Sequence, residues 1–112
     1  MQIINLSSQP FSPELYQDLC ERLSPDRVFE RLVFIDKERP LEEQVDHIVN
    51  SIQWDDSVVN MPSLPIAAAM IARKIRGKNV RLLRLKLSGE ERKLIFSELV
   101  PLDREEPNEE EP

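Results

Sequence analysis

A chain of 112 residues with 40% hydrophobic residues has the size and apolar content of one globular domain. Its apolar runs are shorter than the ~20 residues that a membrane-spanning helix needs, and it does not open with a secretory leader, so we expect a cytoplasmic protein. The net charge of −6 is uneven, because residues 103–112 hold six acidic residues and one arginine, which predicts a disordered acidic tail after a domain of residues 1–102.

The first part of the chain predicts a strand followed by a helix. Residues 1–6 are mostly apolar, as in a buried parallel strand. Ser12 followed by Pro13 is a helix-start signal, and the helix should end near Ser24 and Pro25. Four residues at helical spacing predict its buried face, namely Tyr16, Leu19, Cys20 and Leu23.

The same order then repeats twice. Residues 28–35 are rich in Val, Ile and Phe and predict a second strand, and residues 41–53 carry an amphipathic stripe that predicts a second helix. Residues 57–61 predict a third strand. The Ala-rich run 66–72 predicts a helix that is buried against the sheet and ends at Gly77.

Two strands predicted over residues 80–87 and 93–100 flank a short turn, which favours an antiparallel hairpin. Alternation places Leu83, Leu85 and Leu87 on one face of the first of these strands, opposite Leu82, Arg84 and Lys86. The order βαβαβα plus a hairpin predicts an α/β protein: a small Rossmann-like three-layer sandwich with a mostly parallel sheet and a C-terminal antiparallel hairpin.

Common cofactor and metal motifs are missing from this sequence. Gly77 and Gly89 are the two glycines and neither lies between a strand and a helix, which argues against a dinucleotide fingerprint and a P-loop. His47 is the single histidine, on a helix flank, and Cys20 is expected to be a core thiol. Trp54 is expected to be a core or interface anchor. We therefore expect no cofactor and no metal.

Polar side chains follow the predicted strands, at the edge of a parallel sheet where ligands commonly bind. The candidates are Asn5, Ser7, Ser8 and Gln9 after the first strand, Asp36 after the second, and Asn60, Pro62 and Ser63 after the third. Hydroxyl and amide donors beside helix N-termini suit phosphodiesters. Turn and cap formation is the competing explanation for each serine taken alone.

Several short motifs in residues 1–87 resemble one protein family. They are Asn5-Leu6-Ser7, Pro10-Phe11-Ser12, the run Leu64-Pro65-Ile66-Ala67-Ala68-Ala69 and the strand from Val80 to Arg84. Together they are similar to the small CRISPR-associated proteins of type III systems, a ring-nuclease-related family akin to the CRISPR-associated Rossmann fold domains.

This resemblance implies a homodimer that binds cyclic oligoadenylate, most often the four-adenosine ring, in antiviral defence. The loops with Asn5, Ser7, Ser8, Pro62 and Ser63 would line the site, and Arg84 would be a phosphate partner. Ser8 stands where the family often has a histidine, which implies slow metal-independent cleavage or none and leaves the catalytic residues unassigned. The expected role is sequestration of the messenger.

A second interpretation starts from nine basic residues within positions 73–93, against two glutamates. They would suit a small accessory protein that binds RNA or an acidic protein partner through this segment, although solvated helix ends and guarded sheet edges also collect Lys and Arg. A Rossmann-like toxin or antitoxin component, whose acidic tail mimics nucleic acid, is a third alternative. Neither DNA nor a membrane is an expected partner.

Overall fold

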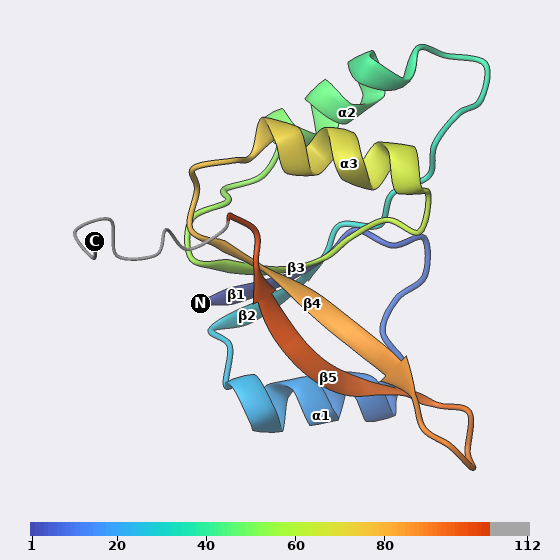
Figure 1. Cartoon of the computed structure of the whole chain (residues 1–112), viewed down its shortest axis with the longest axis vertical. Helices are drawn as coiled ribbons and strands as arrows, with labels where there is room; N and C mark the ends of the chain where they lie inside the picture. Colours follow the sequence, from blue (N-terminus) through green and yellow to red (C-terminus); the bar gives the residue numbers. More distant parts are fainter. Residues whose placement is uncertain (104–112) are drawn as a thin grey trace, which may run out of the picture.

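One mixed sheet with helices on both faces makes up the fold in the computed structural model, which describes residues 1–103 (Figure 1). The strands lie in the order β2-β1-β3-β4-β5, and all are parallel except the antiparallel β4–β5 pair. The predicted α/β Rossmann-like class is confirmed. The elements along the chain are β1 (Gln2–Asn5), α1 (Pro13–Leu23), β2 (Arg27–Glu30), α2 (Leu41–Asn50), β3 (Ser57–Asn60), α3 (Pro65–Lys74), β4 (Val80–Leu87) and β5 (Leu94–Pro101).

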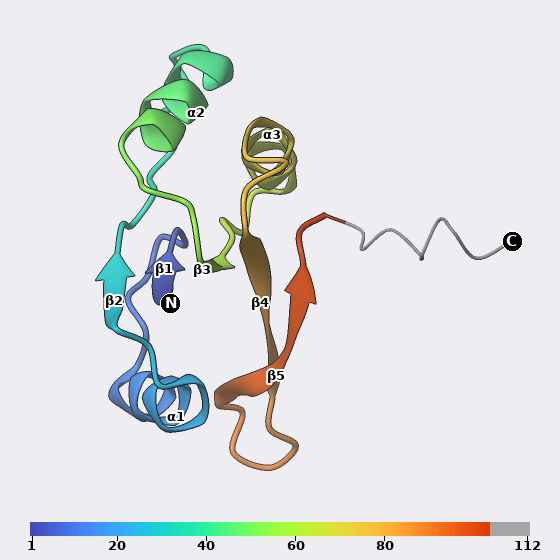
Figure 2. The same cartoon turned by 90° about the vertical axis from the view of Figure 1, so that its left-hand side faces the viewer.

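Two hydrophobic cores lie on the two faces of the sheet. Ile4 and Val59 point to the side of α2 and α3, where they pack in one cluster with Val45 and Ile71. Ile3, the neighbour of Ile4, points to the opposite side and packs against α1. Figures 1 and 2 show the resulting layers, with α1 on one side of the sheet and α2 and α3 on the other. The short central strands are apolar on both faces because both faces are covered.

Helix α1 begins as predicted, but the set of residues on its buried face differs from the prediction. The Ser12 hydroxyl accepts a hydrogen bond from the Leu15 amide at 3.2 Å, and Pro13 occupies the first turn. Leu15 and Leu19 are the buried residues, whereas Tyr16 is 44% exposed and Cys20 is half-buried. The prediction for Tyr16 was wrong because a Leu15–Leu19 line, one position earlier, faces the sheet.

Strand β2 is shorter than predicted, since pairing ends at Glu30 and not at Ile35. The reason is its neighbour: β1 ends at Asn5, so the residues after Glu30 have no strand beside them. Val33 still donates its amide to the Ser7 carbonyl and packs in the core, but the chain around it is irregular. The apolar run therefore predicted the burial of Val33 correctly, but the prediction that the residues after Glu30 pair in a strand was wrong.

Helix α2 also ends early, at Asn50 and not at Gln53. The Ser51 hydroxyl and amide both bond to the Ile48 carbonyl and close the last turn. Trp54 is 3% exposed and donates its indole N–H to the Val49 carbonyl at 2.9 Å, so it is a core residue. Helix α3 ends at Lys74, and the chain turns at Gly77, whose φ is +85°.

Strands β4 and β5 extend beyond the central strands. Ser57 to Val59 pair with Val80 to Leu82, and β4 then continues to Leu87 past the end of β3. The pairing of β4 with β5 shifts by one residue between Arg84 and Leu85, so Ser97 has no opposite partner. Leu83 and Leu85 share one face of β4 as predicted, and this face packs on the α1 side, whereas Leu87 is outside that cluster and is 63% exposed.

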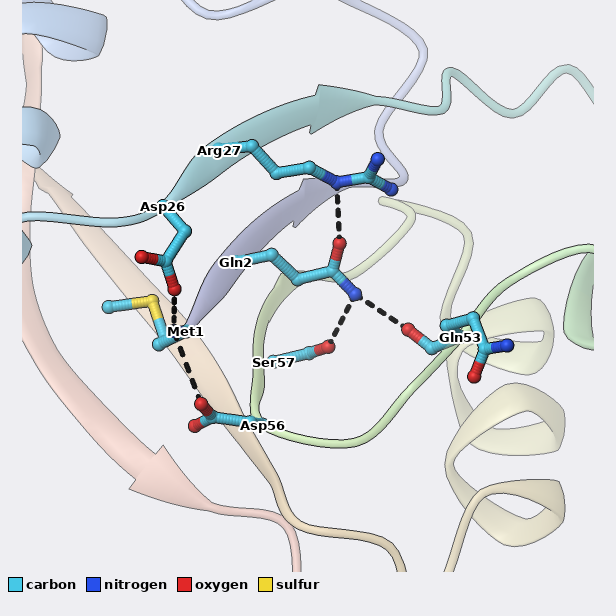
Figure 3. A network of polar contacts seen from close by, with 7 residues as sticks. All are labelled: Met1, Gln2, Asp26, Arg27, Gln53, Asp56 and Ser57. Atoms are coloured by element: carbon cyan, nitrogen blue, oxygen red, sulfur yellow. Dashed lines mark hydrogen bonds and ion pairs between the residues drawn. The ribbon is translucent and has the colours of Figure 1, made fainter.

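Polar contacts join the start of β1 to its neighbouring strands (Figure 3). The Met1 ammonium contacts the carboxylates of Asp26 and Asp56, and Gln2 bonds to Arg27, Ser57 and the Gln53 carbonyl. At the C-terminal end of the described residues, the Asp103 carboxylate accepts a hydrogen bond from the Gly77 amide at 2.7 Å. The rest of the predicted acidic tail, residues 104–112, lies outside the described residues. Within residues 1–103, no helix is long and apolar enough to cross a membrane.

Candidate functional site

The loops after β1 and β3 meet at one cavity of about 600 Å³, at the carboxyl edge of the parallel strands. We call it the loop cavity. Ser7, Ser8 and Gln9 line it from the first loop, and Asn60 and Ser63 line it from the third strand and its loop. The loop after β3, the segment leading into α1, the start of α1 and the β4–β5 hairpin complete its walls with Met61, Pro10, Phe11, Ser12, Glu14, Leu15, Leu85, Lys93 and Leu94. Its volume lies within the ~300–1,000 Å³ typical of small-molecule sites.

Asn5 holds the first loop in place and does not line the cavity. Its side chain is fully buried, and its oxygen accepts hydrogen bonds from the Ser7 amide, the Ser7 hydroxyl and the Asn60 amide group, at 2.8 to 3.0 Å. Its nitrogen donates to the Gln9 carbonyl at 2.9 Å and to the Glu30 carboxylate at 2.8 Å. One amide therefore connects β1, β2, β3 and the loop, which is a structural role.

The hydroxyl of Ser7 is also used within the loop, since it lies 2.7 Å from the Gln9 carbonyl and 2.8 Å from the Asn5 oxygen. Ser8, Gln9 and Ser63 differ from Ser7. Each is exposed, and none of their side chains hydrogen-bonds to another residue of the described part of the chain. Their donors are thus available to a ligand in the loop cavity.

The predicted site residues divide between two places. Ser7, Ser8, Gln9 and Ser63 line the loop cavity, and Pro62 lines a smaller cavity of about 250 Å³ that also contains Ser8 and Ser63. Asp36 lies outside both. Its carboxylate accepts the Glu38 amide at 2.9 Å, and its backbone bonds to Gln44, which makes it a turn residue before α2.

Arg84 also lies outside the walls of the loop cavity. It is 67% exposed on β4, and its guanidinium is 3.1 Å from the Glu98 carboxylate across the hairpin. Leu85, its neighbour, lines the cavity, and successive strand residues point to opposite faces. The structure therefore does not bring Arg84 together with the serine loops.

Charge in the loop cavity is nearly balanced, because Lys93 and Glu14 are its only ionisable lining residues within the described part of the chain. Asn60 was among the candidates after the third strand, whereas Lys93 was not a predicted site residue. Asn60 follows the same strand-end pattern as Ser63, so the sequence did carry a signal for it. The hairpin extends beyond the end of β3, and this brings Lys93, Leu85 and Leu94 to the cavity. The sequence pattern does not show this, because it depends on the unequal lengths of the paired strands.

The nine basic residues of the 73–93 segment do not form one free patch. They run from the end of α3, along β4, to the hairpin turn at the opposite end of that strand (Figure 1). Five of them have carboxylate partners among residues 1–103, namely Arg73, Lys74, Arg76, Arg84 and Lys93. The pKa of Lys74 is raised above 10.5, mainly by its hydrogen bond to Asp46 and despite some desolvation.

Comparisons with known proteins identify no relative. No protein-family model matches the chain, and neither a curated protein nor a solved structure is significantly similar to it. In residues 1–103, no three His, Cys, Asp or Glu residues gather as a metal site would require. The geometry of the loop cavity and the motifs in the sequence are therefore what indicate a function.

Proposed function

We propose that the chain binds a cyclic oligoadenylate, in the first place the four-adenosine ring, and lowers the free concentration of this messenger in type III CRISPR signalling. The observation that carries the proposal is the meeting of the Ser7–Gln9 loop and the Ser63 loop at one cavity. The motifs that resemble the CRISPR-associated family adjoin these two loops, and the resemblance implies that the loops line the site. A cavity lined by both loops supports a shared role of the two loops in binding one ligand.

The chemistry of the cavity suits a phosphodiester ring with bases. Free hydroxyl and amide donors from Ser8, Gln9 and Ser63 can bond to phosphate oxygens or base edges, and Lys93 adds a positive charge. Phe11, Met61, Leu85 and Leu94 supply apolar wall against which an adenine can pack. A nearly neutral cavity with many donors favours recognition by shape and hydrogen bonds over general attraction to nucleic acid.

A homodimer is part of the proposal. A two-fold pair presents its loops twice, and a ring of four identical nucleotides contains a matching two-fold axis. One ring would then occupy two loop cavities. Each protomer would need to hold only half of the ring, which is compatible with a cavity of about 600 Å³.

Binding without efficient turnover follows from the side chains present. Glu14 and Lys93 are the ionisable groups among the described lining residues, and neither is a histidine placed to take a proton from a ribose hydroxyl. Cleavage would then depend on alignment of the 2′-hydroxyl with its phosphate and would be slow.

The test is a titration of the purified chain with cyclic tetra-adenylate, with linear tetra-adenylate as the matched ligand. We expect one ring bound per two chains, weaker binding of the linear form and less than one cleavage event per dimer during the assay. Absence of binding at micromolar protein contradicts the proposal. Equal binding of both forms with steep salt dependence would support the RNA-binding alternative through the 73–93 segment.

Matched variants locate the site. Ser63→Trp fills the loop cavity and should weaken ring binding by at least about tenfold, because it blocks the ligand sterically. Asn50→Trp is the control, since Asn50 is also exposed, forms no side-chain hydrogen bond within residues 1–103 and lies at the end of α2, away from the cavity. If both variants bind the ring like the parent chain, the ligand site is elsewhere.

A further inference from the structure

A third cavity, of about 160 Å³, lies between α2 and the irregular segment after β2. We call it the arginine cavity. Arg31, Arg39 and His47 line it together with apolar residues of both segments. No Asp or Glu is among its described lining residues, so the two arginines give the lining a positive charge. Neither the loop cavity nor the proposed oligoadenylate site includes any of these three residues.

Of these three residues, Arg31 points most directly to an anion-binding site. Its side chain is half-buried, and its guanidinium bonds to the Leu32 carbonyl at 3.1 Å, without any carboxylate partner among residues 1–103. Partial burial of a cation without a counter-charge costs free energy, which an anion in the cavity would offset. A guanidinium also has five N–H donors, and one internal bond leaves most of them available.

A buried side chain positions the turn that brings Arg39 to the wall of the arginine cavity. Gln44, which is 9% exposed, accepts the Asp36 amide at 2.8 Å and donates to the carbonyls of Asp36, Arg39 and Pro40. These bonds fix the turn that carries Arg39. The Arg39 guanidinium contacts Glu43 at 3.3 Å through one nitrogen, an exposed pair that leaves its other donors free.

The remaining wall is apolar and partly uncovered. Val33, Phe34, Ile35 and Ile48 line the cavity, and Phe34 is 74% exposed although it is a large aromatic residue. Exposed aromatic surface beside positive donors suits a ligand with an anionic head and an apolar or aromatic body.

We propose that the arginine cavity is a second binding site, for the phosphate group of an organic phosphate whose apolar part packs on Phe34. Two guanidinium groups can bind a phosphate through paired hydrogen bonds, with His47 as a third contact. The site does not depend on oligoadenylate binding in the loop cavity. Phe34 also lines the cavity of about 250 Å³ that contains Ser8 and Ser63, so it lies between the two sites.

The experiment uses the full chain, labelled with ¹⁵N and ¹³C, and two probes: inorganic phosphate and phenyl phosphate. Each is titrated at constant ionic strength against chloride while the side-chain signals of Arg31, Arg39 and His47 are followed by NMR. We expect saturable shifts confined to these residues and Phe34. Phenyl phosphate should bind about tenfold more tightly because its ring buries apolar surface on Phe34.

Three variants decide the interpretation. Arg31→Gln and Arg39→Gln should each weaken phenyl phosphate binding about tenfold, and Arg39 is exposed enough for its variant to fold normally. Arg22→Gln is the control, because Arg22 also forms an exposed helical ion pair, with Asp18, on the far side of the sheet. Equal weakening by Arg22→Gln, or the absence of saturable shifts in the arginine cavity, overturns the proposal.

Discussion

At the scale of single residues, the polar groups after β1 divide into those that build the loop and those that are free. From the sequence, Asn5, Ser7, Ser8 and Gln9 look alike, since all follow a buried strand. Burial separates them: Asn5 is 0% exposed with every polar atom bonded internally, whereas Ser8 and Gln9 are exposed. Composition cannot make this distinction, because it depends on which neighbouring strand supplies a partner. Here the partners of Asn5 are Asn60 on β3 and Glu30 on β2.

Asn5→Asp tests the structural role of this amide. The substitution keeps the acceptor oxygen, but it replaces the donor to Gln9 and Glu30 with a second oxygen and places a carboxylate beside a carboxylate. We expect the free energy of unfolding to fall by about 3 kcal/mol at neutral pH. The loss should shrink as pH falls, because the buried carboxyl has a raised pKa in the folded state and becomes a donor once protonated.

Urea unfolding followed by the fluorescence of the buried Trp54 measures this change. Asn79→Asp is the matched control, since Asn79 is exposed and lies away from the Asn5 contacts. Equal stability of Asn5→Asp and the parent chain at neutral pH would show that the amide does not hold the loop.

The Met1 ammonium predicts a dependence of stability on pH. Its hydrogen bonds to Asp26 and Asp56 raise its pKa above 8.0, and the same contact lowers the pKa of Asp26 below 3.8. The raised pKa gives a stabilisation that is complete below pH 8.0 and is lost as pH rises through the folded-state value. The lowered pKa gives one that is present above pH 3.8 and is lost as pH falls.

We therefore expect the thermal midpoint of the parent chain to decrease when pH rises above 8.0. The Asp26→Asn, Asp56→Asn double variant should lack most of this decrease, because its ammonium has no carboxylate partner. Asp55→Asn is the control, as Asp55 is exposed and forms no ion pair within residues 1–103. The same slope in all three proteins would contradict the assignment. Both effects should be small, since these groups are at the surface.

At the scale of elements, the sequence predicts where elements exist better than where they end. The cap formed by Ser12 and Pro13 is local chemistry, so the start of α1 agrees with the prediction. The end of β2 depends on the length of β1, which no pattern in residues 28–35 encodes. For the same reason, the hairpin wall of the loop cavity was not predicted: Leu85 and Lys93 reach it only because β4 continues beyond β3.

The bulge at Ser97 supports a prediction about β5. Leu99 and Phe96 both pack on the α1 side although they are three positions apart, which a regular strand would not allow. Deletion of Ser97 should restore regular pairing and keep Phe96 on the α1 side, because Phe96 would then lie two strand positions from Leu99. We expect the free energy of unfolding to change by less than about 1 kcal/mol, since the core contacts of both residues are kept.

Ser97→Ala is the matched control and should have little effect, because it keeps the extra residue in the strand. Chemical denaturation compares the two variants, and amide exchange in β4 shows whether its pairing with β5 is kept. A deletion variant about 2–4 kcal/mol less stable than Ser97→Ala would contradict the prediction, because it would mean that Phe96 has left the core on the α1 side.

At the scale of the whole molecule, alternation of strands and helices was sufficient to predict the layers and the mostly parallel sheet, because covered sheets with crossover helices allow few topologies. The meeting of the first and third loops follows from the same rule, since β1 and β3 are neighbours in parallel. The arginine cavity does not follow from it. Its side chains come from an irregular segment, a turn and a helix, whose spacing the alternation pattern leaves open.

The central position of β1 has a consequence for synthesis of the chain. β1 is translated first, yet it pairs with β2 on one side and β3 on the other, and β3 is encoded more than fifty residues later. Until Ser57–Asn60 has left the ribosome, the apolar first strand has at most one edge covered. Nascent chains that stop before β3 should therefore expose Ile3 and Ile4 to chaperones, and those that include it should begin to bury them.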